Sequence, residues 1–189
     1  MKTLTTRELV LSAALAAISA AVQLVHIGYQ SPQWGMWIDV VAVTWIVAFF
    51  LFDVRSALIV SLLGGLIITL FAPDTWLGAV MKFTATFPMW FSLFFWLKMK
   101  KEKISYYGKL KTLIIPIIIG VMIRSALVIP LNYYFAIPIW TGMTPTQAIS
   151  AIPWYIIAAF NIFQGILDVG LAWLIVFRFK IVRFATWYE

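Results

Sequence analysis

Long apolar runs separated by short polar connections occupy most of the chain. A helix needs about 20 residues to cross the ~30 Å hydrocarbon core of a bilayer, and several runs reach or approach that length. We therefore predict an all-α membrane protein, a single bundle of six transmembrane helices that forms one domain over residues 1–189. The six predicted spans are Thr6–Val25, Ile38–Phe52, Ser56–Phe71, Leu77–Leu97, Thr112–Ile137 and Trp154–Phe179.

The second and third predicted spans are short for a bilayer. Only residues 53–55, "DVR", separate them, so the two are predicted to form a helical hairpin. Local thinning of the bilayer or burial within the protein accommodates such short spans. Residues 145–150, "PTQAIS", are predicted to form a short helix at the outer surface.

The composition agrees with the membrane class and excludes several kinds of site. The chain is 63% hydrophobic and 11% charged, whereas soluble domains carry about 25% charged residues. It has no cysteine and one histidine, which excludes disulfides, thiolate metal sites and multi-histidine centres. The basic, apolar start could be a signal peptide, but we interpret it as a retained first helix because the rest of the chain is equally apolar.

The basic residues predict the orientation. With six spans, both chain ends and every second loop lie on the same side of the membrane. Twelve of the fourteen basic residues lie on that side, and the loops of the opposite side contain none. By the positive-inside rule both termini are cytoplasmic, and the net charge of +7 needs no nucleic-acid partner. We expect a multi-pass membrane protein. The twelve are Lys2, Arg7, Arg55, Lys98, Lys100, Lys101, Lys103, Lys109, Lys111, Arg178, Lys180 and Arg183.

Four ionisable residues fall inside the predicted spans away from their cytoplasmic ends: Asp39, Lys82, Arg124 and Asp168. Charged groups in hydrocarbon cost at least a few kcal/mol, so they face protein or a wet cavity. Arg124 and Asp168 could form a structural ion pair or contact a ligand, and Asp39 and Lys82 could be hydrated near the outer surface. Polar residues on one face of the last span, around Gln164, predict a pocket that opens outward.

Tryptophans are frequent in the outer loops and at the span ends. Interfacial belts account for most such residues, but some could cover a flat ligand. The candidates for that role are Trp34, Trp37 and Trp76.

The first span is rich in alanine. Six of residues 13–21 are alanine, and Ala13, Ala17 and Ala21 repeat every four residues on one face. Small residues allow helix backbones to approach closely, and in lipid this packing drives helix association. The face could pack inside the bundle or dock a partner.

No motif of a self-sufficient transporter or enzyme is present. The sequence has no Walker A loop, no His-x-x-x-His pair, no Gly-x-Ser-x-Gly and no obvious inverted repeat. A chain with an outward pocket and no energy source captures a ligand and depends on a partner. The rival hypotheses are a membrane-embedded enzyme that uses Asp168 or Asp39, and a self-sufficient solute carrier or channel.

The short N-terminus, the Ala-x-x-x-Ala helix and the six spans resemble the substrate-capture subunit (S component) of energy-coupling factor (ECF) vitamin transporters. The resemblance implies that Ala13, Ala17 and Ala21 dock a membrane coupling (T) subunit. It also implies two ATPase subunits as partners, and a vitamin as transported substrate rather than a cofactor. The location that it implies is the cell membrane of a prokaryote. Neither catalytic residues nor a metal are expected.

Three segments resemble the riboflavin-specific branch: residues 37–53, "WIDVVAVTWIVAFFLFD"; residues 132–140, "NYYFAIPIW"; and residues 152–178, "IPWYIIAAFNIFQGILDVGLAWLIVFR". The match implies that Asn132 and Asn161 hydrogen-bond the ligand. Gln164 stands where that branch has a lysine. That branch also has a second aspartate shortly after its Ile-Asp motif, and residues 38–43, "IDVVAV", lack it. Lys82 and Arg124 are not part of the riboflavin pattern, and a cationic pocket would suit an anionic vitamin such as pantothenate or a phosphorylated one.

The expected ligand-binding residues are therefore Asn132, Asn161 and Gln164, with Asp39 and Lys82 at the outer edge of the pocket and Trp37 and Trp76 over a flat ring. Buried amide side chains can pair with ring carbonyl and imino groups without adding charge. Riboflavin or a related flavin is the first expectation for the ligand.

Overall fold

The computed structural model describes residues 5–25, 27–31, 36–71 and 75–187. In chain order, its helices and strands are α1 (Thr6–Val25), β1 (Gly28–Gln30), β2 (Trp37–Asp39), α2 (Val43–Leu51), α3 (Val54–Phe71), α4 (Thr75–Lys100), α5 (Ile114–Leu131), α6 (Ile137–Thr141), α7 (Pro145–Ala151) and α8 (Trp154–Trp173). Two π-helical turns extend the helices: Asn132–Ala136 joins α5 to α6, and Leu174–Arg178 continues α8. Short 3₁₀ turns cover Ile104–Gly108, Leu110–Leu113 and Ile181–Phe184.

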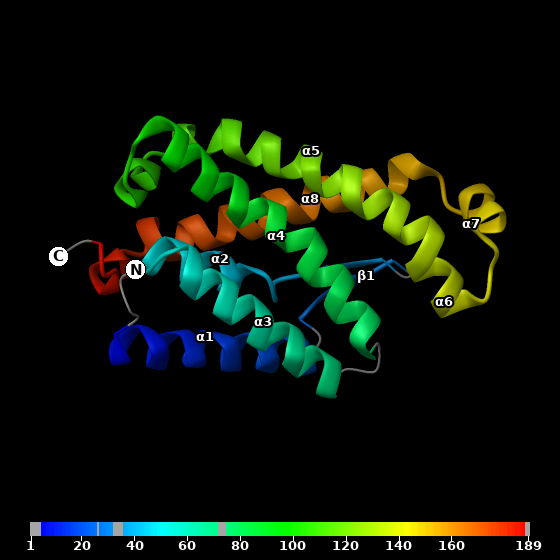
Figure 1. Cartoon of the computed structure of the whole chain (residues 1–189), viewed down its shortest axis with the longest axis horizontal. Coiled ribbons are helices and arrows are strands. Elements are labelled where there is room, and N and C mark those ends of the chain that lie inside the picture. Colours follow the sequence, from blue (N-terminus) through cyan, green and yellow to red (C-terminus); the bar gives the residue numbers. More distant parts are fainter. Residues whose placement is uncertain (1–4, 26, 32–35, 72–74, 188–189) are drawn as a thin grey trace.

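The long helices run side by side along the long axis of the molecule (Figure 1). The start of α1, the end of the described chain and the α4–α5 connection lie at one end, whereas α6 and α7 lie at the other. The basic residues of the α4–α5 connection therefore share one end of the bundle with both chain ends. The cytoplasmic location of that end stays a prediction.

Four helical stretches of the described chain are long and apolar enough to cross a membrane: Thr6–Val25, Trp76–Lys100, Leu110–Thr141 and Trp154–Arg178. They correspond to the first, fourth, fifth and sixth predicted spans. Helix α3 lies in the third predicted span and is a shorter apolar helix. The protein is thus a helical membrane protein, as expected, and six complete spans remain a prediction.

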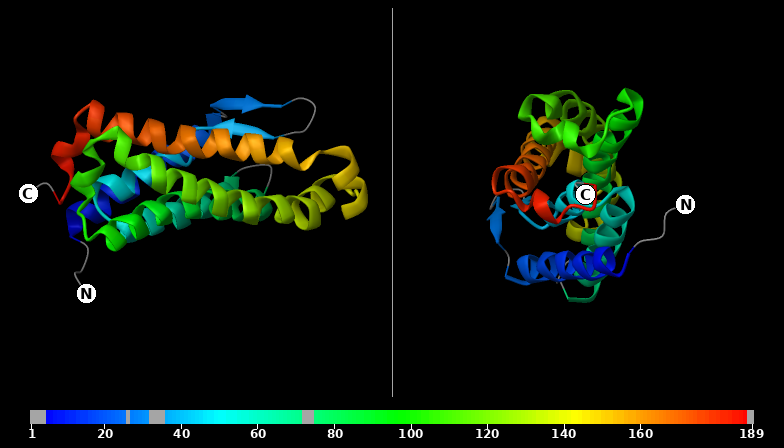
Figure 2. Two further views of the ribbon diagram at one scale, coloured as in Figure 1. Left: turned by 90° about the horizontal axis from the view of Figure 1, so that it is seen from above. Right: turned by 90° about the vertical axis from the view of Figure 1, so that its left-hand side faces the viewer.

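The second predicted span, Ile38–Phe52, is wrong as a continuous helix. Ile38 and Asp39 belong to strand β2, and α2 begins only at Val43. Its nine residues extend about 14 Å, half of a bilayer core. Strands β1 and β2 form an antiparallel hairpin in which Gly28 faces Asp39, and this hairpin lies along one side of the bundle (Figure 2).

Helix α2 lies at the centre of the protein instead of in contact with lipid. All nine of its residues are buried, among them Trp45, Phe49 and Phe50, and the helix packs against α1, α3, α4 and α8. A helix that is apolar on every side is stable only when it is enclosed. The predicted hairpin with α3 is confirmed, because Asp53 Oδ1 accepts hydrogen bonds from the Arg55 and Ser56 backbone N–H groups, both at 2.9 Å, at the start of α3.

Helix α1 packs its polar face inward against α2 and α3. Ser12, Ala16 and Ser19 are buried, and Ser19 Oγ accepts a hydrogen bond of 3.0 Å from Trp45 Nε1. Ala13, Ala17 and Ala21 lie on the opposite, exposed side. These three alanines, which repeat every four residues, are therefore not part of the hydrophobic core of the described chain.

The short helix expected at residues 145–150 is present as α7. Thr144 and Gln147 form a reciprocal capping box at its start, in which Thr144 Oγ1 accepts from the Gln147 backbone N–H at 3.3 Å and Gln147 Oε1 accepts from the Thr144 backbone N–H at 2.8 Å.

Candidate ligand-binding site

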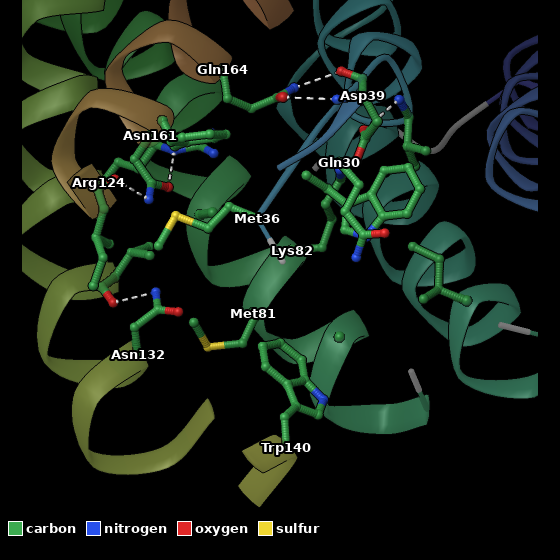
Figure 3. Close-up of a pocket in the computed structure, with 18 of the residues that line it drawn as sticks. Gln30, Met36, Asp39, Met81, Lys82, Arg124, Asn132, Trp140, Asn161 and Gln164 are labelled. Carbon is green, nitrogen blue, oxygen red and sulfur yellow. Dashed lines mark hydrogen bonds and ion pairs between the residues drawn. The ribbon is translucent and has the colours of Figure 1, made fainter. Parts of the chain in front are cut away.

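A cavity of about 380 Å³ lies between the β-hairpin and helices α1, α3, α4, α5, α6 and α8. This volume is in the range of small-molecule sites. Figure 3 shows that side chains from distant parts of the chain converge on it. The lining residues are Val22, Gln23, Ile27, Gln30, Met36, Trp37, Asp39, Val41, Ile68, Gly78, Met81, Lys82, Ala85, Arg124, Val128, Asn132, Ile137, Trp140, Thr141, Ile152, Ile157, Phe160, Asn161 and Gln164.

The structure brings most of the predicted site residues together. Asp39, Lys82, Asn132, Asn161, Gln164 and Trp37 all line this cavity. Trp76 does not line it, and its side chain is 56% exposed on α4. Trp34 lies outside the described residues.

Gln164 holds strand β2 against α8. Its Nε2 donates to the Asp39 backbone oxygen at 2.7 Å, and its Oε1 accepts from the Asp39 backbone N–H at 3.0 Å. The same Nε2 donates to Asp168 Oδ1 at 2.7 Å. Both polar atoms of the Gln164 amide are therefore hydrogen-bonded within the protein. The side chain pairs with the Asp39 backbone as a neighbouring strand would (Figure 3).

The Asp39 side chain connects the hairpin to α4. Asp39 Oδ2 forms an ion pair with Lys82 Nζ, and Asp39 Oδ1 accepts a hydrogen bond of 3.0 Å from the Val41 backbone N–H. Both side chains of the pair are largely buried, with 18% of Lys82 and 13% of Asp39 exposed. Lys82 is thus neutralised at the wall of the cavity.

Arg124 and Asp168 form a second, deeper pair. Arg124 Nη1 lies 3.7 Å from Asp168 Oδ2, and the two side chains are 6% and 0% exposed. Arg124 Nε donates to Asn161 Oδ1 at 2.9 Å, and Asn161 Nδ2 donates to the Ile157 backbone oxygen at 2.9 Å. Of the two alternatives left open for these residues, the ion pair is present, and Arg124 also lines the cavity.

Asn132 lies where α5 widens into its π-helical turn. The turn closes with a hydrogen bond from the Ile137 backbone N–H to the Asn132 oxygen, next to Pro138, which has no N–H to donate. Asn132 Nδ2 donates to the Val128 backbone oxygen at 2.9 Å. Its Oδ1 has no hydrogen bond within the described chain, so it is available to a ligand.

Several lining residues were missed from the sequence, among them Met36 and Met81 (Figure 3). Trp140, one of the tryptophans near the span ends, was not among the residues expected to cover the ligand, and it also lines the cavity. Gln23 and Gln30 carry no local signal, because only the packing of α1 and the hairpin brings them to the cavity.

Comparisons with known proteins show the fold. No protein-family model and no curated protein matches the chain. A solved structure, described as the S component of a bacterial ECF transporter, superimposes with a TM-score of 0.72 at 23% sequence identity. The match covers 92% of this chain and 95% of that chain, so the two share their fold over most of their lengths.

Proposed function

We propose that this protein is the membrane-embedded S component of an ECF-type transporter and captures a vitamin from outside the cell for ATP-driven uptake. The observation that carries the proposal is a ligand-sized cavity with a buried polar wall, inside a fold shared with an S component. Arg124, Asn161 and Gln164 of this wall are buried, and a low local dielectric strengthens a hydrogen bond to a ligand.

Riboflavin or a related flavin is the proposed ligand. Asn132 and Asn161 occupy the positions of the riboflavin-branch motifs, and both line the cavity. Aromatic side chains at Trp37, Trp140 and Phe160 also line it, and such faces stack on flat rings.

An anionic vitamin such as pantothenate is the second candidate. Lys82 and Arg124 both line the cavity. They favour an anionic ligand if it replaces their carboxylate partners, Asp39 and Asp168, as the paired anion.

We propose that the partners are a T subunit and two ATPase subunits. Ala13, Ala17 and Ala21 are exposed on α1, so a second membrane helix can approach this row closely. The basic end of the bundle then faces the cytoplasm of a prokaryote, where the ATPase subunits bind nucleotide.

The assembly is tested by affinity purification of the tagged chain from membranes of its native host, with mass spectrometry of the proteins that copurify. The proposal expects two ATPase chains and one multi-span coupling subunit in constant ratio. Purification of the chain without any ATPase chain, in a detergent that preserves other transporter complexes, would contradict it.

A further inference from the structure

The charged groups of the cavity occur as two pairs contributed by four elements. Lys82 of α4 pairs with Asp39 of β2, and Arg124 of α5 pairs with Asp168 of α8. Asp39, Lys82 and Arg124 line the cavity, whereas Asp168 does not line it but lies 3.7 Å from Arg124; within the described chain, no other Asp, Glu, Lys or Arg is among the lining residues. With Asp168 included, the formal charges of these four groups sum to zero.

An electroneutral wall disfavours a ligand with net charge. Removing an ion from water is costly unless an opposite charge compensates it, and both cations here already have a carboxylate partner. An anionic group placed at Arg124 would also lie near Asp168, whose Oδ2 is 3.7 Å from Arg124 Nη1. A neutral ligand avoids both penalties.

Arg124 nevertheless needs a hydrogen-bond acceptor. A guanidinium has five N–H donors, and only the Nε donor of Arg124 is used, at 2.9 Å from Asn161 Oδ1. Neither terminal nitrogen makes a hydrogen bond in the described structure, although the residue is only 5% exposed and lines the cavity. A neutral carbonyl oxygen satisfies such a donor without adding charge.

Building on the proposed function, and choosing its neutral candidate over the anionic one, we infer that the ligand is electrically neutral and presents a carbonyl oxygen to the Arg124 guanidinium. Arg124 is then the specificity-determining residue, and Asp168 sets the charge of the site. Asn132, about 12 Å along the same helix, offers its free Oδ1 to an N–H or O–H group of the ligand.

The test uses probes that differ in charge at one group. Riboflavin is compared with riboflavin 5′-phosphate, and pantothenate with its neutral alcohol, by calorimetric titration of the purified full-length chain. For the vitamin that binds, the neutral member is expected to bind at least about tenfold more tightly than the anionic member.

Two variants separate charge from hydrogen bonding. Asp168→Asn leaves Arg124 without its carboxylate partner and is expected to shift the preference toward the anionic member by about tenfold. Arg124→Met combined with Asp168→Leu keeps the wall neutral and is expected to weaken binding of the neutral member by about 10- to 100-fold. Ile123→Met, on the exposed side of α5, is the matched control and is expected to bind as the parent does.

Each outcome has one meaning. Tighter binding of the anionic member by the parent overturns the inference and leaves vitamin capture intact. Parental affinity in the folded double variant also overturns it, because the guanidinium would then make no ligand contact. If none of the four probes binds the parent, the proposed ligand class fails, and the inference that rests on it fails too.

Discussion

At the scale of single residues, the site is a chain of buried polar contacts rather than a set of free side chains. Asn161 illustrates this, because its Oδ1 accepts from Arg124 Nε and its Nδ2 donates to the Ile157 oxygen. One N–H of the amide remains for a ligand. Asn161 thus both orients the guanidinium and faces the cavity, and its removal affects two groups together.

Asn161→Ala is expected to weaken ligand binding by about 10- to 100-fold, equivalent to roughly 1–3 kcal/mol, since a buried hydrogen-bonding group is left without its partner. Titration of the purified variant with the ligand of the parent measures the effect. Ile162→Ala, whose parent side chain is 40% exposed on the same helix, is the control. If both variants bind like the parent, Asn161 does not belong to the site.

At the scale of elements, long apolar runs could be predicted from the sequence and the hairpin could not. Helices α1, α4, α5 and α8 lie where spans were predicted, because a helix that faces lipid must be continuous and apolar. Helix α2 is equally apolar for a different reason, burial by protein on every side, and hydropathy does not distinguish the two. The contact of Gln164 with Asp39 joins residues 125 positions apart, which no local pattern specifies.

The hairpin gives a second prediction, through Gln164. Gln164→Leu removes both hydrogen bonds to the Asp39 backbone, and each buried group left unpaired costs about 1–3 kcal/mol. Amide hydrogen exchange over Gly28–Gln30 and Trp37–Asp39 is expected to accelerate, while exchange in α5 stays unchanged. Equal protection of the hairpin in both proteins would show that Gln164 does not hold it.

The exposed alanine row gives a third prediction. Ala17→Leu is expected to leave ligand affinity intact and to reduce uptake by about tenfold or more, because the larger side chain prevents close helix approach. Ala126→Leu, the same substitution on the exposed side of α5, is the control. Parallel loss of binding and uptake would place the row in internal packing, contrary to its exposure.

At the scale of the whole molecule, charge and cavity lie in different parts of the bundle. The basic α4–α5 connection shares one end with both chain ends, whereas α6, whose Trp140 lines the cavity, lies at the other (Figure 1). A cysteine introduced at Lys103 is therefore expected to react with a membrane-impermeant reagent only from the cytoplasmic side. A cysteine at Thr144 is expected to react only from outside, and the reverse pattern would contradict the orientation.

If the cavity holds a small molecule for uptake, that molecule is detectable on the purified chain. Native mass spectrometry and a visible absorption spectrum of the same sample measure it. We expect one bound small molecule per chain, with the mass and the colour of a flavin, and its loss from Asn161→Ala. A folded parent that retains no compound and acquires none when incubated with vitamins would show that the cavity does not bind such a ligand.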